Sequence, residues 1–213
     1  MKVFIMHKKG LSDRLQKILS LLCECKFVED IEIITSEHSV LKFSTALENV
    51  TTLPNDFPLY EISQSQKSLY HKHFRAYEKI VASGDAAIIF EDDVLFDPPV
   101  LDKFVADFNT IPADWEFCFF GTGCKLTLPG TGFIKNNTRL KSKCCDSMVV
   151  HPAAAKRIYD DLKSGKAYMV TDWDLNYRFM KHGTIVYWYE PGIITQGSEN
   201  GSYTSTVIPR SIS

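Results

Sequence analysis

Short apolar runs alternate along the chain with longer segments in which apolar residues recur every three or four positions. A continuous apolar run predicts a buried strand, and the longer recurrence predicts a helix with one buried face. The predicted strands cover residues 2–6, 31–34, 86–90, 117–120, 147–150 and 185–189. The predicted helices cover residues 11–22, 64–83, 100–109, 152–162 and 172–181, with Ser12 or Asp13 as the cap of the first.

The order of these elements predicts one α/β domain across residues 1–213, which is the whole protein or one domain of a larger one. Strands that alternate with helices favour a mixed, mainly parallel sheet flanked by crossover helices. The segment 36–58 contains Pro54 and Pro58, and we expect it to be mostly loop. Residues from about 197 to 213 are rich in Ser, Thr and Gly, which predicts a flexible tail.

Composition and charge narrow the range of functions. The net charge is −2 and the isoelectric point is about 6.3, so no bulk attraction for nucleic acid is expected. No run has the length of a membrane span, and the first apolar run is too short for a signal peptide. The six cysteines fit neither a zinc knuckle nor convenient disulfides, so we expect reduced thiols, with Cys118 and Cys124 in or near the core and not acting as ligands. These features predict a cytoplasmic protein, or one in the host cytoplasm if it is viral.

Three consecutive carboxylates, Glu91-Asp92-Asp93, directly follow a continuous apolar strand. In an open α/β fold they would lie at the carboxyl edge of the sheet, where ligands bind. Three ionised carboxylates repel one another, and a divalent cation would relieve that repulsion. Alternation along an extended backbone places Glu91 and Asp93 on one side, where both can hold Mn²⁺ or Mg²⁺, and directs Asp92 elsewhere, toward a ribose hydroxyl. A solvated acidic turn is the simpler alternative, but the apolar segments on both sides disfavour it.

The segment AIIFEDDVLF, residues 87–96, resembles the signature of glycosyltransferase family 25, which includes lipooligosaccharide and collagen galactosyltransferases. Weaker similarities to that family follow in order over about residues 1–200. They are the opening strand with Arg14, the helix with His71 and His73, the segments 146–159 and 170–174, and the closing Pro191 and Gln196.

The resemblance implies the GT-A fold of nucleotide-diphospho-sugar transferases, with Mn²⁺ and a nucleotide-sugar diphosphate held at the acidic motif. It implies transfer of a hexose from a UDP-sugar to a glycan or hydroxylated acceptor, with inversion. It also places a catalytic carboxylate at Asp172 or Asp174, with a slight preference for Asp174, because an inverting transfer needs a base for the acceptor hydroxyl. From their positions in the predicted elements, His7, Arg14 and His71 are candidates to contact the nucleotide.

Two other functions remain compatible with the same residues. A catalytically inactive GT-A module would bind nucleotide or carbohydrate without turnover. A metal-dependent phosphoesterase would need further carboxylates or histidines that converge on Glu91 and Asp93. A third protein ligand for the metal is left open between Gln196 and His151, with water as the alternative, because no histidine follows His182.

Overall fold

The computed structural model describes residues 1–35, 41–45 and 61–204. Within these residues, seven strands form one sheet in the order β2-β1-β3-β7-β5-β8-β6. The strands are β1 Lys2–Met6, β2 Asp30–Ile34, β3 Ala87–Glu91, β5 Phe117–Phe119, β6 Gly132–Lys135, β7 Ser147–Val150 and β8 Val186–Glu190. A separate two-stranded ribbon pairs β4 (Val94–Leu95) with β9 (Thr195–Gln196) in antiparallel orientation.

The sheet is mixed, and most of its strands point the same way. β1 is parallel to both β2 and β3, and β5 is parallel to β8, whereas β7 runs antiparallel to β3 and β5, and β6 antiparallel to β8. In this part of the chain five strands therefore share one direction and two oppose it, which confirms the predicted mixed, mainly parallel α/β sheet. The reversal of β7 was not predicted, because a strand buried on both faces is the same apolar run in either direction.

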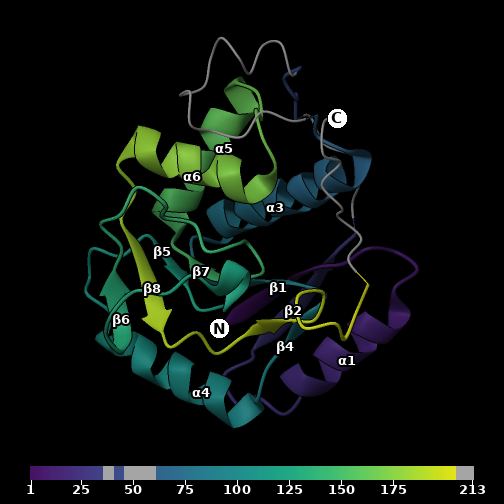
Figure 1. Ribbon diagram of the computed structural model, residues 1–213, viewed down its shortest axis with the longest axis vertical. Helices are drawn as coiled ribbons and strands as arrows, with labels where there is room; N and C mark the ends of the chain where they lie inside the picture. Colours follow the sequence, from purple (N-terminus) through teal and green to yellow (C-terminus); the bar gives the residue numbers. More distant parts are fainter. Residues whose placement is uncertain (36–40, 46–60, 205–213) are drawn as a thin grey trace.

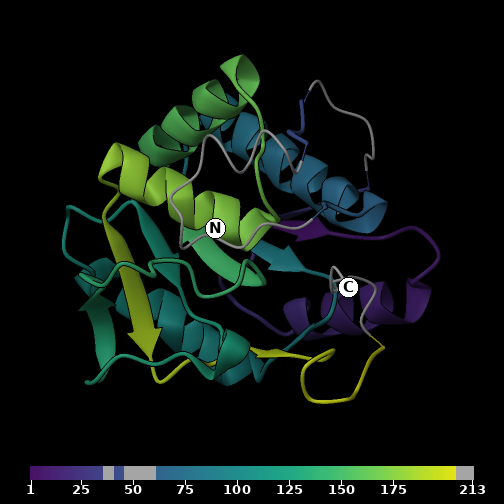
Figure 2. The ribbon, with the colours of Figure 1, turned by 45° about the horizontal axis from the view of Figure 1, so that its top comes forward.

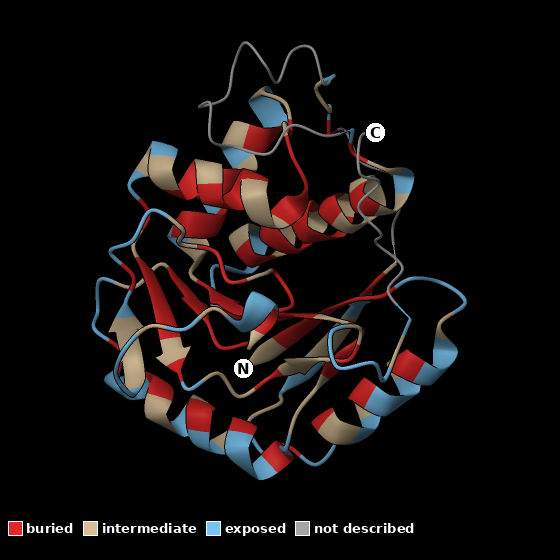
Figure 3. Ribbon diagram, in the orientation of Figure 1, coloured by how far each residue is buried: buried red, intermediate tan, exposed pale blue. Residues whose placement is uncertain are grey.

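Helices cover both faces of the sheet (Figures 1 and 2). The helices are α1 Ser12–Leu22, α3 Gln64–Ser83, α4 Pro98–Asp107, α5 Pro152–Ser164 and α6 Thr171–His182, with short 3-10 turns η1 Phe108–Thr110 and η2 Gly123–Lys125. α1 and α4 lie on one face, and α3, α5 and α6 lie on the other. Buried residues of these helices pack against the sheet and, among α3, α5 and α6, also against one another; Figure 3 marks the buried positions in red.

Each face of the sheet has its own hydrophobic core, and β1 contributes to both. Val3 and Ile5 belong to the core under α1 and α4, whereas Phe4 and Met6 belong to the core under α3, α5 and α6. This division follows from the two-residue alternation of a strand. A strand covered on both faces is apolar at every position, which is why β1 and β3 were recognisable in the sequence.

Helix ends match the expected signals in part. α3 begins with a capping box in which Ser63 and Gln66 satisfy each other's backbone N–H groups, and it ends at Gly84 with a φ of 75°. α1 begins at Ser12, but its cap position is Leu11, and no side chain caps it. The predicted capping by Ser12 or Asp13 is therefore wrong, although the start of the helix is correctly placed.

The chain after β9 packs against the acidic segment. Residues 197–204, the first part of the predicted tail, make specific contacts: Gly197 N–H donates to the Asp93 carbonyl over 2.8 Å. The Arg14 guanidinium lies 4.9 Å from the centre of the Tyr203 ring. A Cβ at Gly197 would lie 2.4 Å from that ring, so only glycine fits. Residues 205–213, and most of the predicted loop 36–58, lie outside the described part of the chain. Among the described residues, no helix is long and apolar enough to cross a membrane.

Candidate functional site

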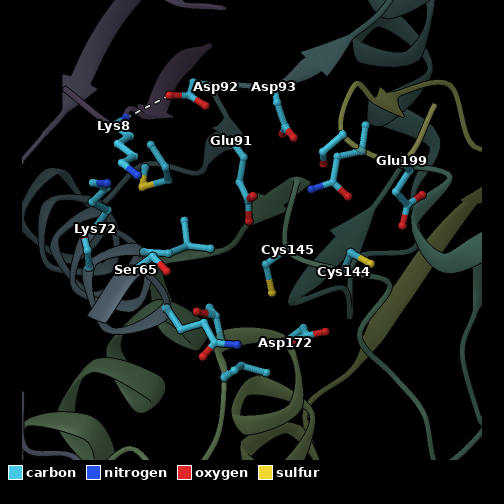
Figure 4. A pocket seen from close by; sticks show the side chains of 18 of the residues that line it. Lys8, Ser65, Lys72, Glu91, Asp92, Asp93, Cys144, Cys145, Asp172 and Glu199 are labelled. Carbon is cyan, nitrogen blue, oxygen red and sulfur yellow. Dashed lines mark hydrogen bonds between the residues drawn. The ribbon is translucent and has the colours of Figure 1, made fainter. Parts of the chain in front are cut away.

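A cleft of about 660 Å³ opens where β1 and β3 end. These strands are parallel neighbours with Met6 opposite Glu91, so the residues that follow both strands meet at one edge of the sheet. The cleft is also lined by residues of α3, of the loop before β7, of the first turn of α6 and of the chain after β9. Figure 4 shows that the side chains of Glu91 and Asp93 both extend into this space.

Asp92 also borders the cleft, but its carboxylate is engaged by the protein. Its Oδ2 accepts a hydrogen bond from Lys8 N–H over 2.9 Å and lies 2.8 Å from His7 Nδ1. Arg14 Nη1 lies 3.5 Å from Asp92 Oδ1. Asp92 therefore holds the acidic segment against the end of β1 and against α1. His7 is 5% exposed and does not border the cleft, so the predicted direct contact of His7 with the nucleotide is not supported.

Glu91 and Asp93 are placed where ionisation is costly. Burial raises the pKa of Glu91 well above its usual range, and the charges of Asp93, Asp92 and Asp172 raise it further. Burial also raises the pKa of Asp93, although the nearby Ser198 hydroxyl acts in the opposite direction. Asp93 Oδ1 is buried and accepts no hydrogen bond from the residues that the structure describes. These two carboxylates are consequently short of positive partners.

Asp146 is a third carboxylate of this group, and the sequence analysis did not single it out. It immediately precedes β7, whose pairing with β3 brings it beside Glu91, and Glu91 N–H donates to the Asp146 carbonyl over 2.9 Å. Its carboxylate is fully buried: Ser147 Oγ donates to Oδ1 over 2.9 Å, and Oδ2 has no hydrogen-bond partner among the described residues. Burial, and then the charge of Glu91, raise the pKa of Asp146 well above its usual range. The available signal was an Asp directly before a fully apolar strand.

Cations border the same cleft. Lys8 follows β1, Arg14 lies in α1, and Lys72 extends from α3 with only 4% of its surface exposed. Lys72 lowers the pKa of Glu91, but this effect is smaller than the opposing effects of burial and of the neighbouring carboxylates. The cleft thus presents buried acids together with nearby basic side chains, an arrangement suited to a dication and a phosphate-bearing ligand together.

The first turn of α6 separates the two candidate catalytic carboxylates. Asp172 borders the cleft, and burial raises its pKa. Asp174 is fully buried away from the cleft, where it accepts hydrogen bonds from Tyr168 N–H over 2.7 Å, from Arg178 Nε over 2.6 Å and from the Tyr70 hydroxyl. Residues two positions apart in an α-helix point about 200° away from each other, so only one of Asp172 and Asp174 can face the cleft. The geometry therefore does not support the slight preference for Asp174, and Asp172 is the candidate that borders the cleft.

We compared the chain with known protein families and solved structures. No protein-family model and no curated protein matches the chain. A solved glycosyltransferase involved in the glycosylation of the major capsid of PBCV-1 is similar, with a TM-score of 0.50, 10% identity, and 92% of each chain covered. Mouse xyloside xylosyltransferase 1 is similar with a TM-score of 0.50, 11% identity, and coverage of 98% of this chain and 100% of that one. The protein has a GT-A-like fold.

These similarities concern the fold. The glycosyltransferase GlyE of Streptococcus pneumoniae TIGR4 is also similar, with a TM-score of 0.48 and 8% identity over 94% of this chain, and this chain spans about half (48%) of its length. Membership of glycosyltransferase family 25, in contrast, stays a prediction from the motif, since no family model matches.

Of the other residues predicted to contact a ligand or metal, Gln196 borders the cleft and His71 and His151 do not. The His71 ring lies 5.3 Å from the Phe43 ring and does not border the cleft, so the predicted nucleotide contact of His71 is not supported. His151 caps α5, where its Nδ1 accepts from Ala153 N–H over 3.2 Å, and it is not a candidate metal ligand. Gln196 does border the cleft, because the pairing of β9 with β4 places it opposite Val94.

His73, which the sequence placed on the helix before the acidic motif, lies next to Glu91. It is fully buried, and its Nε2 lies 3.7 Å from Glu91 Oε1, too far for a hydrogen bond. Burial, aided by the charge of Lys72, lowers the pKa of His73 to about 3, so the ring is neutral at pH 7. His73 therefore supplies no positive charge to Glu91.

Proposed function

We propose that this chain is a glycosyltransferase that moves a hexose from a UDP-sugar to a hydroxyl group of a glycan or protein acceptor, with Mn²⁺ or Mg²⁺ held by Glu91 and Asp93. The observation that carries the proposal is a pair of carboxylates with raised pKa, the half-buried Glu91 and the buried Asp93, which face one cleft at the carboxyl edge of a GT-A-like sheet. The glycosyltransferases of similar fold support the reaction class.

The donor set fits a hard divalent ion. Mg²⁺ and Mn²⁺ prefer oxygen ligands and are commonly held by one or two carboxylates together with substrate phosphates. Glu91 and Asp93 provide two carboxylates, and Asp93 Oδ1 is free of hydrogen bonds from the described residues. When bound, such an ion acts as a Lewis acid that stabilises the departing diphosphate.

Basic side chains at the mouth of the site would bind the same diphosphate. Lys8 and Lys72 border the cleft on one side, as Figure 4 shows, and Arg14 borders it as well. Charge-assisted hydrogen bonds from lysine and arginine to phosphate are about twice as strong as neutral ones. We assign the diphosphate to the space between these cations and the acidic pair. Arg14 thereby keeps its predicted role in nucleotide binding, and Asp92 acts by positioning Arg14 and the acidic segment.

Asp172 is placed to act as the base on the acceptor. In Figure 4 it lies on the side of the cleft opposite Asp92 and Asp93. Burial raises its pKa toward the range in which a carboxylate is an effective base near neutral pH. Trp173 borders the cleft beside it and offers an aromatic surface for a sugar ring. Deprotonation of the acceptor hydroxyl from the side opposite the leaving diphosphate corresponds to transfer with inversion.

A thermal-shift series tests the donor site. UDP, UDP-glucose and UDP-galactose are added with Mn²⁺, with Mg²⁺ or with EDTA, because a ligand of the folded state raises the melting temperature. We expect stabilisation by each nucleotide only when metal is present, and its loss in Asp93→Ala. Asp160→Asn, which removes an exposed carboxylate of α5, is the matched control and should behave as wild type. Equal stabilisation by UDP in EDTA would contradict the metal site.

Product analysis separates the proposal from its two rivals. The protein is incubated with UDP-galactose or UDP-glucose, Mn²⁺ and a panel of sugar acceptors, and UDP, inorganic phosphate and glycosylated product are quantified. A transferase releases UDP in step with product. A binding module shows the thermal shift without UDP release. A phosphoesterase hydrolyses the diphosphate of the donor to UMP and sugar 1-phosphate, and releases inorganic phosphate only by hydrolysing those monoesters further; either result would refute glycosyl transfer.

A further inference from the structure

A second cluster of metal-ligand side chains lies on another wall of the cleft. Cys124 lies in η2, Cys144 lies in the loop before β7, and Glu199 follows β9, so three distant segments meet. The two Sγ atoms are 3.1 Å apart, and both lie within 4.8 Å of a Glu199 carboxylate oxygen. Within residues 1–35, 41–45 and 61–204, no other three His, Cys, Asp or Glu side chains bring their ligand atoms so close.

The backbone around these residues is shaped to bring them together. Cys124 and Cys144 both have left-handed conformations, with φ values of 55° and 51°, which are strained for a non-glycine residue and tend to occur at ligand-binding sites. A Cβ at Gly123 would lie 2.6 Å from Cys144 Sγ, so only glycine admits the thiol at this position. Cys124 N–H donates to Glu199 Oε1 over 3.0 Å, which fixes the carboxylate beside the sulfurs.

Cys124 is exposed, contrary to its predicted place near the core, whereas Cys118 is fully buried as expected. Its exposure gives an ion direct access from solvent.

We propose that Cys124, Cys144 and Glu199 bind one divalent ion of the Zn²⁺ class, at a position separate from the Glu91 and Asp93 site. Two sulfur ligands select Zn²⁺ over Mg²⁺ and Mn²⁺, which prefer oxygen, so the two positions select different ions. Binding converts both thiols to thiolates and releases their two protons to solvent. A water molecule completes a four-coordinate shell.

The sulfur separation is compatible with an ion and requires a small adjustment. Two thiolates at about 2.3 Å from a tetrahedral Zn²⁺ lie about 3.8 Å apart, so the sulfurs must separate by about 0.7 Å. The exposed Cys124 side chain has room for that movement. A disulfide would instead need the sulfurs to approach to about 2.05 Å, and it would make no use of the carboxylate that the Cys124 N–H holds in place.

An ion at this position would fasten the chain after β9 to the wall of the cleft. In Figure 4, Cys144 and Glu199 lie on the side of the cleft away from Lys8 and Lys72. Ser198, next to Glu199, also borders the cleft. The ion would thus tie the segment that contains Ser198 and Glu199 to the loop before β7, and would stabilise the folded protein by the linkage of binding to folding.

Metal titration of the reduced protein tests the proposal directly. Co²⁺ is added to the full chain under anaerobic conditions with a phosphine reductant, and the thiolate-to-cobalt charge-transfer absorption is followed; Zn²⁺ is then added to displace the cobalt. We expect one equivalent of Co²⁺ with that absorption, displaced by one equivalent of Zn²⁺. Cys124→Ser and Cys144→Ser should each weaken Zn²⁺ binding at least 100-fold, and Glu199→Gln about 10-fold. Cys23→Ser, which alters an exposed thiol outside the cluster, should bind as wild type.

The result can fail in two distinct ways. Unchanged Zn²⁺ stoichiometry in the Cys124→Ser, Cys144→Ser double variant would place the ion elsewhere and overturn the assignment. Absence of Zn²⁺ binding at 100-fold molar excess, together with loss of two thiols on treatment with oxidised glutathione, would identify the pair as a disulfide former instead. The Asp93→Ala variant keeps this site, so retained Zn²⁺ binding there separates the two metal positions and keeps this proposal independent of the donor site.

Discussion

The molecule contains two groups of buried or half-buried carboxylates, and it compensates the charges of only one of them. In the α6 network, Asp174 and Asp161 surround Arg178, whose Nε donates to Asp174 over 2.6 Å and whose Nη1 donates to Asp161 over 2.6 Å. The cleft group consists of Glu91, Asp93, Asp146 and Asp172. Asp93 and Asp146 each keep one buried oxygen without a hydrogen bond from the described residues.

The difference lies in which charges are compensated within the fold and which are not. Burial of a carboxylate is costly unless hydrogen bonds and a counter-charge compensate it. The α6 network provides both within the fold, and Arg178 Nη2 also donates to the Lys166 carbonyl over 2.7 Å. The cleft group lacks such compensation, so the pKa values of Glu91, Asp93, Asp146 and Asp172 are all raised. A folded protein that retains this group is suited to receive positive charge from outside.

The largest expected effect is on stability, from the replacement of Arg178 by Met. The substitution leaves Asp174 buried without its counter-charge, and breaking a buried ion pair in this way typically costs about 3–5 kcal/mol. Urea unfolding followed by circular dichroism measures the change. Glu91→Gln is the matched change in the cleft group and should leave the metal-free protein as stable or up to about 1 kcal/mol more stable, because it removes an uncompensated acid. Equal losses in both variants would remove the distinction between the two groups.

The comparison also shows what the sequence could and could not predict about the site. The acidic motif was recognisable because two apolar runs flank three carboxylates, and strand order then placed it at the ligand edge. Asp172 and Asp174 could not be separated, because the choice depends on how α6 is rotated against α3, where Tyr70 contacts Asp174. Such a rotation is set by tertiary packing and leaves no mark in a two-residue spacing.

In the fold, too, the bounds of single elements could be predicted from the sequence, whereas their mutual arrangement could not. The bounds of β1, α3 and β7 agree with the predicted ranges, because a buried run or a long amphipathic repeat is a local property. The antiparallel direction of β7, which places Asp146 beside Glu91, depends on the path of the chain between elements. The meeting of Cys124 with Cys144 has the same origin, since both lie in loops whose course is fixed by their neighbours.

The next effect is on catalysis and separates the two aspartates of α6. Asp172→Asn should lower kcat for sugar transfer by about 10²- to 10³-fold, or about 3–4 kcal/mol in the barrier, because it removes the proposed base. It should leave the unfolding midpoint close to that of the wild type. Asp174→Asn should do the reverse and lower stability, with the folded fraction retaining kcat. Steady-state kinetics and urea unfolding of both variants show which aspartate serves catalysis and which serves stability. A normal kcat in Asp172→Asn would exclude Asp172 as the base.

A third effect is the stabilisation of the cleft group by metal. Mn²⁺ at 100 times its dissociation constant should raise the unfolding free energy of the wild type by about 2.7 kcal/mol, because binding to the folded state adds RT ln(1 + [L]/Kd). Glu91→Gln should lose most of this gain. Arg178→Lys keeps a charge in the α6 network and leaves the cleft group intact, so it should gain as much from Mn²⁺ as the wild type does. Differential scanning fluorimetry with and without Mn²⁺ measures all three, and an equal gain in Glu91→Gln would count against this ligand.

The smallest effect is the acid sensitivity of the α6 network at Asp161. Burial alone would raise the pKa of Asp161, but hydrogen bonds from Lys181 and His182 and the charge of Arg178 lower it overall. A lowered folded-state pKa means that Asp161 stabilises the protein above its unfolded pKa of about 3.9, and that this contribution is lost as the pH falls through the folded value. Asp161→Asn should therefore be about 1–2 kcal/mol less stable than wild type at pH 7, with the gap closing below about pH 4. The exposed pair Lys156–Asp160 is the control: Asp160→Asn should cost less than about 0.5 kcal/mol at any pH, and a pH-independent loss in Asp161→Asn would mean that packing, not charge, accounts for its effect.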